Sequence, residues 1–359
     1  MPTTLAPALA YSATVPRALV HRAAICEVFL TDHTRAGEDE YLIAAQLPRV
    51  HSFYSDHLTS PAAYDPLLLI EVLRQASILV AHAYLEASAD SKFIFVDGEF
   101  ALCPDGGAEA LRIGPLPGRV LIRARQASVK HREGTVVGST LDLELLIDDR
   151  PAATMRTTCQ WMPPAAWDRM RARGRDALAL HPARPHHTGR RVPPAAVGRG
   201  NPQNVVLAEA GLSGDGEGAV HTQIVVDQAH PALFDHPLDH LPGALTFEAL
   251  RQSAVFAAQE LFGLSPRCLQ LSLCAAEFVR FGEFELPTDC RVRPVAVEEP
   301  DTVGFEVSLF QEETEMARSR VHLSRTSPIG VRFTPVAAPA SVPAAEPESA
   351  PQAAGQVGA

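Results

Sequence analysis

The chain has 359 residues, of which 46% are hydrophobic, so two domains with sizeable cores are expected. A formal net charge of −11 excludes a protein whose main partner is nucleic acid, because phosphate binding requires a basic surface. The six cysteines form no Cys-x-x-Cys pair and no metal-binding spacing with histidine, which predicts reduced thiols and a cytoplasmic protein. No apolar run approaches the ~18 residues of a membrane span, so we expect a soluble chain with no membrane partner.

The first domain is predicted over 19–165, after a loose Ala/Pro/Thr-rich segment at 1–18. Two strands are expected at 23–31 and 40–47, followed by a helix over 65–86 with Asp65 as its N-cap. The helix is apolar almost all round, so other elements should surround it. Alternating or apolar runs predict four strands around it, at 93–102, 119–129, 135–147 and 152–161.

The second domain, 204–334, repeats this order of elements. Strands are expected near 204–209 and 219–228, and a helix is expected over 242–262. Four further strands are expected at 268–281, 291–297, 304–310 and 315–324. Two copies of strand, strand, long helix and four strands predict an α+β tandem hotdog fold, in which each antiparallel sheet curls around one helix. Because each sheet would leave unpaired edges, the halves should join edge to edge as an intrachain pseudo-dimer.

The segments outside the two domains differ in charge. Residues 166–203 are predicted to be a basic linker, with eight arginines between Trp167 and Gly200. This linker is either a solvated connector or a docking strip for an acidic partner such as an acyl carrier protein. Residues 335–359 carry a proline at every fourth position up to Pro351 among Ala, Ser and Glu, which predicts a disordered tail.

Each predicted helix carries Glu-x-x-Arg-Gln within its apolar run. The residues are Glu71, Arg74 and Gln75 in the first half and Glu248, Arg251 and Gln252 in the second. A glutamate and an arginine three residues apart share one face of a helix, so an intrahelical ion pair is one interpretation. The duplication and the apolar surroundings favour a functional group. Such a carboxylate should have a raised pKa unless the arginine keeps it ionised, and either state suits acid–base chemistry.

An Asp-His pair precedes each glutamate. His57 lies 14 residues before Glu71, and His236 lies 12 residues before Glu248. A histidine on a loop that faces a helical glutamate forms a usable acid–base pair, although a capping or core role is the alternative. His236 and His240 have no matching distant ligand, so no metal is expected. No nucleotide-binding signature occurs, and no cofactor is expected.

These motifs resemble those of a known family. Residues 16–22 leading into 27–32, and 235–243 leading into 248–252, are similar to the A-factor biosynthesis (AfsA) proteins, over about residues 16–330 without the linker. The resemblance implies tandem hotdog domains and an acyltransferase. Its implied reaction moves a β-ketoacyl group from acyl carrier protein to the hydroxyl of dihydroxyacetone phosphate, as the first step of γ-butyrolactone signal synthesis.

The resemblance places the family's functional glutamates on Glu71 and Glu248 and its functional arginine on Arg251. We expect the second half to carry out the acyl transfer, with Glu248 as the base on the triose hydroxyl, helped by His236. Arg251 would hold the phosphate or the developing oxyanion. Glu71, with Arg74 and His57, would serve a second proton transfer such as ring closure, or would shape the paired site across the interface. The candidate substrate-binding residues are Arg74, Gln75, His240 and Gln252.

Two other functions stay open at this point. A more distant resemblance to hotdog 3-hydroxyacyl-carrier-protein dehydratases suggests a dehydratase or a thioesterase, since one fold serves several chemistries. His57 and Glu71 match the 14-residue spacing of that family, whereas His236 and Glu248 are two residues closer. The second alternative is a non-catalytic protein that binds a butyrolactone or an acyl carrier protein.

Overall fold

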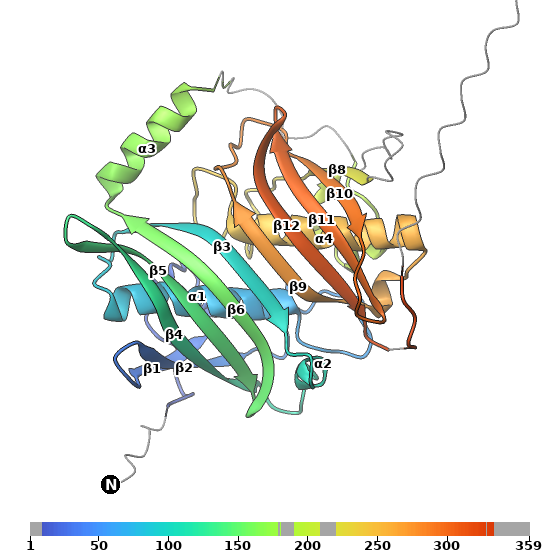
Figure 1. Cartoon of the computed structure of the whole chain (residues 1–359), viewed down its shortest axis with the longest axis horizontal. Helices are drawn as coiled ribbons and strands as arrows, with labels where there is room; N and C mark the ends of the chain where they lie inside the picture. Colours follow the sequence, from blue (N-terminus) through green and yellow to red (C-terminus); the bar gives the residue numbers. More distant parts are fainter. Residues whose placement is uncertain (1–8, 179, 181–189, 209–219, 328, 334–359) are drawn as a thin grey trace, which may run out of the picture.

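The computed structural model describes residues 9–178, 180, 190–208, 220–327 and 329–333. They form one 12-stranded sheet with the strand order β1-β2-β4-β5-β6-β3-β9-β12-β11-β10-β8-β7. Two long helices, α1 (Pro66–Tyr84) and α4 (Gly243–Phe262), lie on one side of this sheet (Figure 1). The predicted α+β tandem hotdog fold is confirmed.

The strands of the first half are all antiparallel to their neighbours and cover α1. They are β1 (Leu30–Arg35), β2 (Glu40–Leu47), β3 (Lys92–Leu102), β4 (Gly118–Arg132), β5 (Thr135–Ile147) and β6 (Arg150–Met162). Leu141, Leu143 and Leu145 of β5 are buried on alternate positions, so they face the helix that packs on this strand. A short helix, α2 (Gly107–Ala110), follows β3.

Helix α1 begins as predicted and forms the centre of the first half. Asp65 accepts a hydrogen bond from Leu67 N at 2.9 Å, and Pro66 occupies the first helical position. Within the described chain, α1 is the one helix long and apolar enough to cross a membrane. However, 78% of its apolar window is buried inside the protein, so it is a core helix.

The expected first strand at 23–31 is wrong over most of its length. Residues Ile25–Glu27 form a 3₁₀ turn, and β1 begins only at Leu30. The physical reason is that Asp235, from the second half, accepts hydrogen bonds from Ala23 N and Ala24 N. A side chain therefore satisfies these backbone groups in place of a strand neighbour.

The second half surrounds α4 in the same way. Its strands are β7 (Leu207–Ala208), β8 (Val220–Ile224), β9 (Leu269–Phe278), β10 (Asp289–Val295), β11 (Thr302–Gln311) and β12 (Thr314–Arg325). Helix α4 packs on β8, β10, β11 and β12. It ends at Phe262, and the φ of +65° at the following Gly263 is the left-handed conformation common after a helix. The predicted tail at 335–359 lies outside the described residues.

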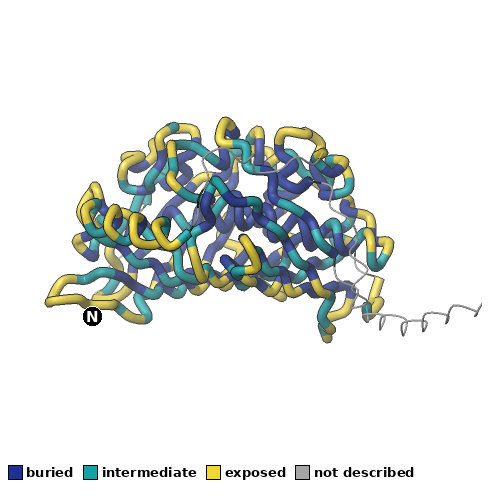
Figure 2. Tube along the Cα trace, turned by 90° about the horizontal axis from the view of Figure 1, so that it is seen from above, coloured by how far each residue is buried: buried dark blue, intermediate teal, exposed yellow. Residues whose placement is uncertain are grey.

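The two halves share one continuous sheet. β3 pairs antiparallel with β9, with Gly98 opposite Ala276 near the middle of the paired segment. A Cβ at Gly98 would lie 2.8 Å from Met155 Cε and 2.9 Å from the Phe95 ring, so a larger residue here would displace these two side chains. Figure 2 shows buried residues along the middle of the molecule and exposed residues on its loops. The prediction that the halves join edge to edge is confirmed.

The predicted basic linker is partly an ordered helix, α3 (Pro164–Asp176). Arg171 of α3 is 5% exposed, and it donates to Glu283 at 2.7 and 2.9 Å and to Asp239 at 3.1 Å. Arg175 also pairs with Glu283. These ion pairs attach α3 to the second half, so the interpretation as a solvated connector is wrong for this helix. Arg171 and Arg175 are likewise occupied by the protein and cannot form a docking strip.

Candidate active site

Four hydrogen bonds from three side chains surround the carboxylate of Glu71 on α1. Arg22 Nε donates at 3.1 Å, Arg74 Nε and Nη2 at 2.8 and 2.9 Å, and Gln75 Nε2 at 2.7 Å. Burial raises the pKa of Glu71, but the guanidinium groups of Arg22 and Arg74 outweigh it and lower this pKa to about 2. The carboxylate is therefore ionised at neutral pH, which is the second of the two states that the sequence left open.

Glu248 on α4 has the same surroundings. Arg199 Nε donates at 2.9 Å, Arg251 Nε and Nη2 donate at 3.0 and 2.6 Å, and Gln252 Nε2 also donates. Glu248 is 0% exposed, and although burial raises its pKa, the two arginines lower it to about 2. The two groups of residues are called cluster 1 (Arg22, Glu71, Arg74 and Gln75) and cluster 2 (Arg199, Glu248, Arg251 and Gln252).

Arg22 and Arg199 were not predicted as site residues. Arg22 lay in the motif that carries the family resemblance, and Arg199 was assigned to the basic linker. Each arginine lies 49 residues before the glutamate that it contacts. This repeated separation is the sequence signal that could have identified both.

The two glutamines tie each helix to a preceding loop. Gln75 Nε2 donates to Glu71 and to the carbonyl oxygen of Glu27, both at 2.7 Å, and its Oε1 accepts from Phe29 N at 3.1 Å. Gln252 makes the equivalent contacts in the second half. Because both N–H groups of each amide are used, neither glutamine can donate to a substrate. The structure thus gives them a supporting role in place of the expected substrate binding.

The aspartates of the Asp-His pairs cross between the halves. Asp235 accepts hydrogen bonds from the two backbone N–H groups that follow Arg22, at 2.6 and 2.9 Å. Asp56 accepts from the two backbone N–H groups that follow Arg199, at 3.0 and 3.1 Å. Each half therefore fixes the loop that supplies an arginine to the cluster of the other half.

His236 consequently lies near cluster 1, whereas the sequence placed it beside Glu248. Burial lowers the pKa of His236, and the nearby charges of Arg22 and Arg74 lower it further, against the opposing effect of Asp235. Nδ1 of His236 lies 3.4 Å from the Asp235 carboxylate. The neutral imidazole is thus favoured at neutral pH, and a donor on Nδ1 leaves Nε2 able to accept a proton.

His57 and His240 contact neither glutamate in the described part of the chain. Nε2 of His57 bonds the carbonyl oxygen of Ala63 at 2.8 Å, and His57 follows the aspartate that binds the loop after Arg199. It is therefore on the side of cluster 2, opposite to the expected pairing with Glu71. His240 bonds Asp239 at 2.6 Å, and its ring contacts Trp167 of α3.

A small pocket of about 20 Å³ opens onto cluster 1 between the starts of the two helices. It is lined by Phe53, Tyr54, Leu67, Ile70, Glu71, Arg74, Ala244 and Phe247. Arg74 is the more accessible arginine, since 22% of its side chain is exposed against 9% for Arg251. Among the described residues no side chain caps α4, so its first N–H groups lie beside this pocket without a side-chain acceptor. The volume holds about one water, so a larger ligand must displace side chains.

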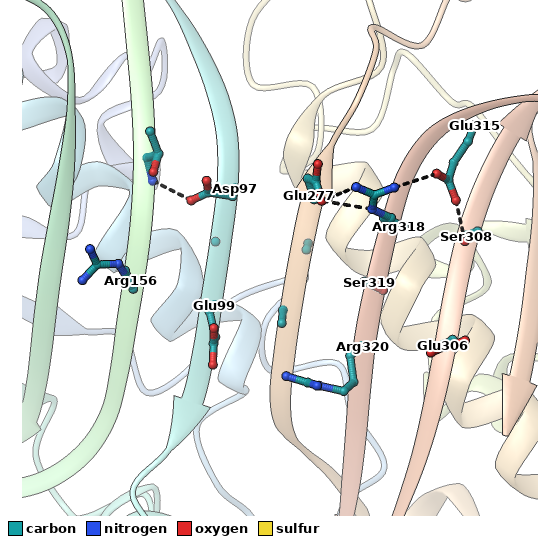
Figure 3. Close-up of a pocket in the computed structure, with 14 residues that line it drawn as sticks. Asp97, Glu99, Arg156, Glu277, Glu306, Ser308, Glu315, Arg318, Ser319 and Arg320 are labelled. Carbon is teal, nitrogen blue, oxygen red and sulfur yellow. Dashed lines mark hydrogen bonds and ion pairs between the residues drawn. The ribbon is translucent and has the colours of Figure 1, made fainter. Parts of the chain in front are cut away.

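A larger open groove of about 660 Å³ crosses the β3–β9 junction on the outer side of the sheet (Figure 3). Several of its charged side chains bind one another or the backbone: Arg318 donates to Glu277 at 2.7 Å, and Asp97 accepts from Thr158 N at 2.9 Å. No residue of either cluster lines this groove. We therefore place the candidate active site at cluster 1.

Two fused hotdog domains, with a charged site between the starts of their helices, define the class of this protein. The chain belongs to the A-factor biosynthesis (AfsA) hotdog domain family, whose profile matches residues 4–163 and 180–327. The resemblance that the sequence motifs indicated is thus confirmed.

Curated relatives carry one enzyme name, 2-oxo-3-(phosphooxy)propyl 3-oxoalkanoate synthase. The relative from Streptomyces virginiae is 30% identical over 84% of this chain and 95% of its own length. The relative from Streptomyces coelicolor is 30% identical over 78% of this chain and 82% of its own length. Among solved structures, a putative oleoyl thioesterase from Lactobacillus plantarum matches with a TM-score of 0.47 and 11% identity, over 81% of this chain and 98% of that chain. The prediction of an acyltransferase-type enzyme is confirmed at the level of the family, while the cytoplasmic location stays a prediction.

Proposed function

We propose that this chain transfers a β-ketoacyl group from an acyl-carrier-protein thioester to the hydroxyl of dihydroxyacetone phosphate. The observation that carries the proposal is cluster 1, where two guanidinium groups face one carboxylate beside an uncapped helix start. Such a site attracts an anionic oxygen. The name of the relatives describes an ester of a 3-oxoalkanoate with a phosphorylated oxopropyl group, which supports this pair of substrates.

Arg74 is the proposed ligand of the phosphate or of the developing oxyanion. Its Nε and Nη2 donate to Glu71, which leaves Nη1 for a substrate oxygen. Glu71 itself is a poor base, because a carboxylate with a pKa of about 2 holds a proton weakly at neutral pH. We assign Glu71 the task of orienting the two arginines. The same argument removes the role of base from Glu248, whose pKa is equally low.

His236 is the proposed general base. It accepts the proton of the triose hydroxyl at Nε2, while Asp235 orients Nδ1. The hydroxyl oxygen then attacks the thioester carbonyl, and the C–S bond breaks. The proton passes from His236 to the thiolate of the carrier protein, so the products are the phosphorylated ester and the free thiol. The first N–H groups of α4 polarise the carbonyl oxygen as negative charge develops on it.

The proposed carrier-protein contact involves α3. Arg169 and Arg173 are the exposed arginines of this helix. Because Arg171 attaches α3 to Asp239, this helix lies against the loop that leads into α4. An acidic carrier protein is the partner that such a surface attracts.

The test is to incubate the purified chain with 3-oxooctanoyl carrier protein and dihydroxyacetone phosphate and to record mass spectra. We expect a phosphorylated ester that forms only when both substrates are present. His236→Gln should lower the rate of ester formation by at least about 10²-fold, which is the range for the loss of a positioned base. His57→Gln, at the equivalent position of the other half, is the matched control and should keep the activity. Release of free 3-oxo acid at the same rate without the triose would contradict the proposal and indicate a thioesterase.

A further inference from the structure

We propose that cluster 2 is a closed, non-catalytic copy of cluster 1, in which the carboxylate of Asp65 takes the place of an anionic oxygen of the substrate. The identity of that substrate rests on the function proposed above. The inference itself depends on a comparison of the two helix starts, the charges and the pocket wall.

The helix start beside cluster 2 is blocked, whereas the one beside cluster 1 is free. Glu71 and Glu248 are both the sixth residue of their helices, so Asp65 and Pro242 occupy equivalent N-cap positions. Asp65 binds the N–H of Leu67 at 2.9 Å, and the residue between them is a proline without an N–H group. Pro242 makes no such contact, and a glycine follows it. Only the start of α4 therefore offers backbone donors to a ligand.

Asp65 also balances the charge of cluster 2. Its Oδ2 lies 3.8 Å from Arg199 Nη1, so the two arginines of cluster 2 face two carboxylates, those of Glu248 and Asp65. In cluster 1 the ion pairs of Arg22 and Arg74 go to Glu71, and the charge of Asp235 also acts on Arg22. Glu27, another buried carboxylate of the first half, is paired with His51 at 3.2 Å. At the N-cap position equivalent to Asp65, the helix start beside cluster 1 has Pro242, which carries no charge.

The contact between Asp65 and Arg199 is a close ion pair without a hydrogen bond. In the described residues, the buried side-chain atoms that lack a partner are Asp65 Oδ2, Arg199 Nη2 and His57 Nδ1, and all three belong to this region. A packed core normally satisfies such atoms. Asp65 and Arg199 therefore face each other at ion-pair distance without direct hydrogen bonds between their side chains.

Cluster 2 retains a structural task, because Arg199 supports the working pocket. Its Nη1 donates to the carbonyl oxygen of Phe53 at 2.6 Å, and its guanidinium carbon lies 4.3 Å from the centre of the Phe53 ring. Phe53 lines the pocket at cluster 1. Arg199 is therefore a positioning residue that acts through Phe53.

The test exchanges the two helix starts. The variant Pro242→Asp with Gly243→Pro gives α4 the blocked start of α1, and we expect kcat to fall at least 100-fold. Its melting temperature should stay equal or rise, because aspartate caps a helix better than proline does. The matched variant, Asp65→Pro with Pro66→Gly, opens cluster 2 and should keep kcat within threefold. Retention of half the activity after blocking α4, or a rate more than threefold above that of the wild type after opening α1, would overturn the inference.

A binding measurement can test this inference independently of the proposed function. We would titrate the chain by calorimetry with a ketone analogue of 3-oxooctanoyl pantetheine, in which a methylene group separates the sulfur from the carbonyl. One site in the wild-type chain and none after blocking α4 would support a single working site even if no triose ester forms. Two sites in the wild-type chain, or undiminished binding after blocking α4, would refute it even if the ester does form.

Discussion

Glu71→Gln and Glu248→Gln form a matched pair that separates stability from catalysis. Each change removes the carboxylate between two largely buried guanidinium groups. The pKa of each carboxyl falls from 4.5 to about 2 in the folded protein, which corresponds to about 3 kcal/mol of the free energy of unfolding. Breaking a buried ion pair costs a similar ~3–5 kcal/mol. Both variants should therefore lose about the same stability.

Urea unfolding at several pH values measures this loss. Because the folded-state pKa lies below the unfolded value, each carboxylate stabilises the fold above pH 4.5, and this contribution disappears as the pH falls toward 2. The difference in unfolding free energy between wild type and either variant should accordingly be constant near neutral pH and shrink below pH 4.5. A difference that does not depend on pH would refute the ionised state of the carboxylates.

Glu71→Gln and Glu248→Gln should differ in kcat although they lose about the same stability. Glu71→Gln frees Arg74 from its fixed orientation, and we expect kcat to fall ~10²–10³-fold, as for the loss of one oxyanion donor. Glu248→Gln should change kcat by less than about tenfold, because no side chain of cluster 2 lines the pocket and Arg199 acts on it through Phe53. If both variants lost kcat equally at equal stability, cluster 2 would belong to the catalytic machinery and the assignment to cluster 1 alone would fail.

Three further predictions concern the base, the carrier protein and the acyl chain. Asp235 raises the pKa of His236 against the lowering effect of burial. Asp235→Asn should therefore move the acidic limb of the kcat–pH profile to lower pH. An unmoved limb would exclude His236 as the titrating base. Replacing Arg169 and Arg173 with Gln should raise the KM for carrier-bound substrate, most strongly at low salt, and equal effects on a small thioester would remove the docking surface. Phe247→Ala should shift the preference toward longer acyl chains by ~0.8 kcal/mol per added methylene, measured as kcat/KM across a chain-length series, and an unchanged preference would place the acyl chain elsewhere.

The fold could be predicted because its signals are local and occur twice. The apolar helices at 65–86 and 242–262 and the alternating strands between 119 and 161 match the observed elements closely. The first strand was misplaced because its neighbour is the side chain of Asp235, more than 200 positions away. A hydrophobic pattern reports burial, but it does not report which distant group satisfies the backbone.

The candidate site could be predicted only where its contacts are local in sequence. The Glu-x-x-Arg pairs lie within one helical turn, so their contacts follow from spacing. The partners Arg22 and Arg199 come from loops whose positions depend on the packing of the two halves. His236 was assigned to the wrong cluster because proximity in sequence suggested Glu248, whereas the fused halves exchange these loops.

Fusion of the two halves is what allows the clusters to differ. In a symmetric homodimer, a residue that closes one site also closes the other, because both subunits have the same sequence. In the fused chain, Asp65 and Pro242 hold equivalent positions but are encoded separately. One helix start can therefore be capped for stability while the other keeps free donors for the substrate. Since Arg199 of the closed cluster supports Phe53 in the open one, selection for a stable cluster 2 also preserves the shape of the working pocket.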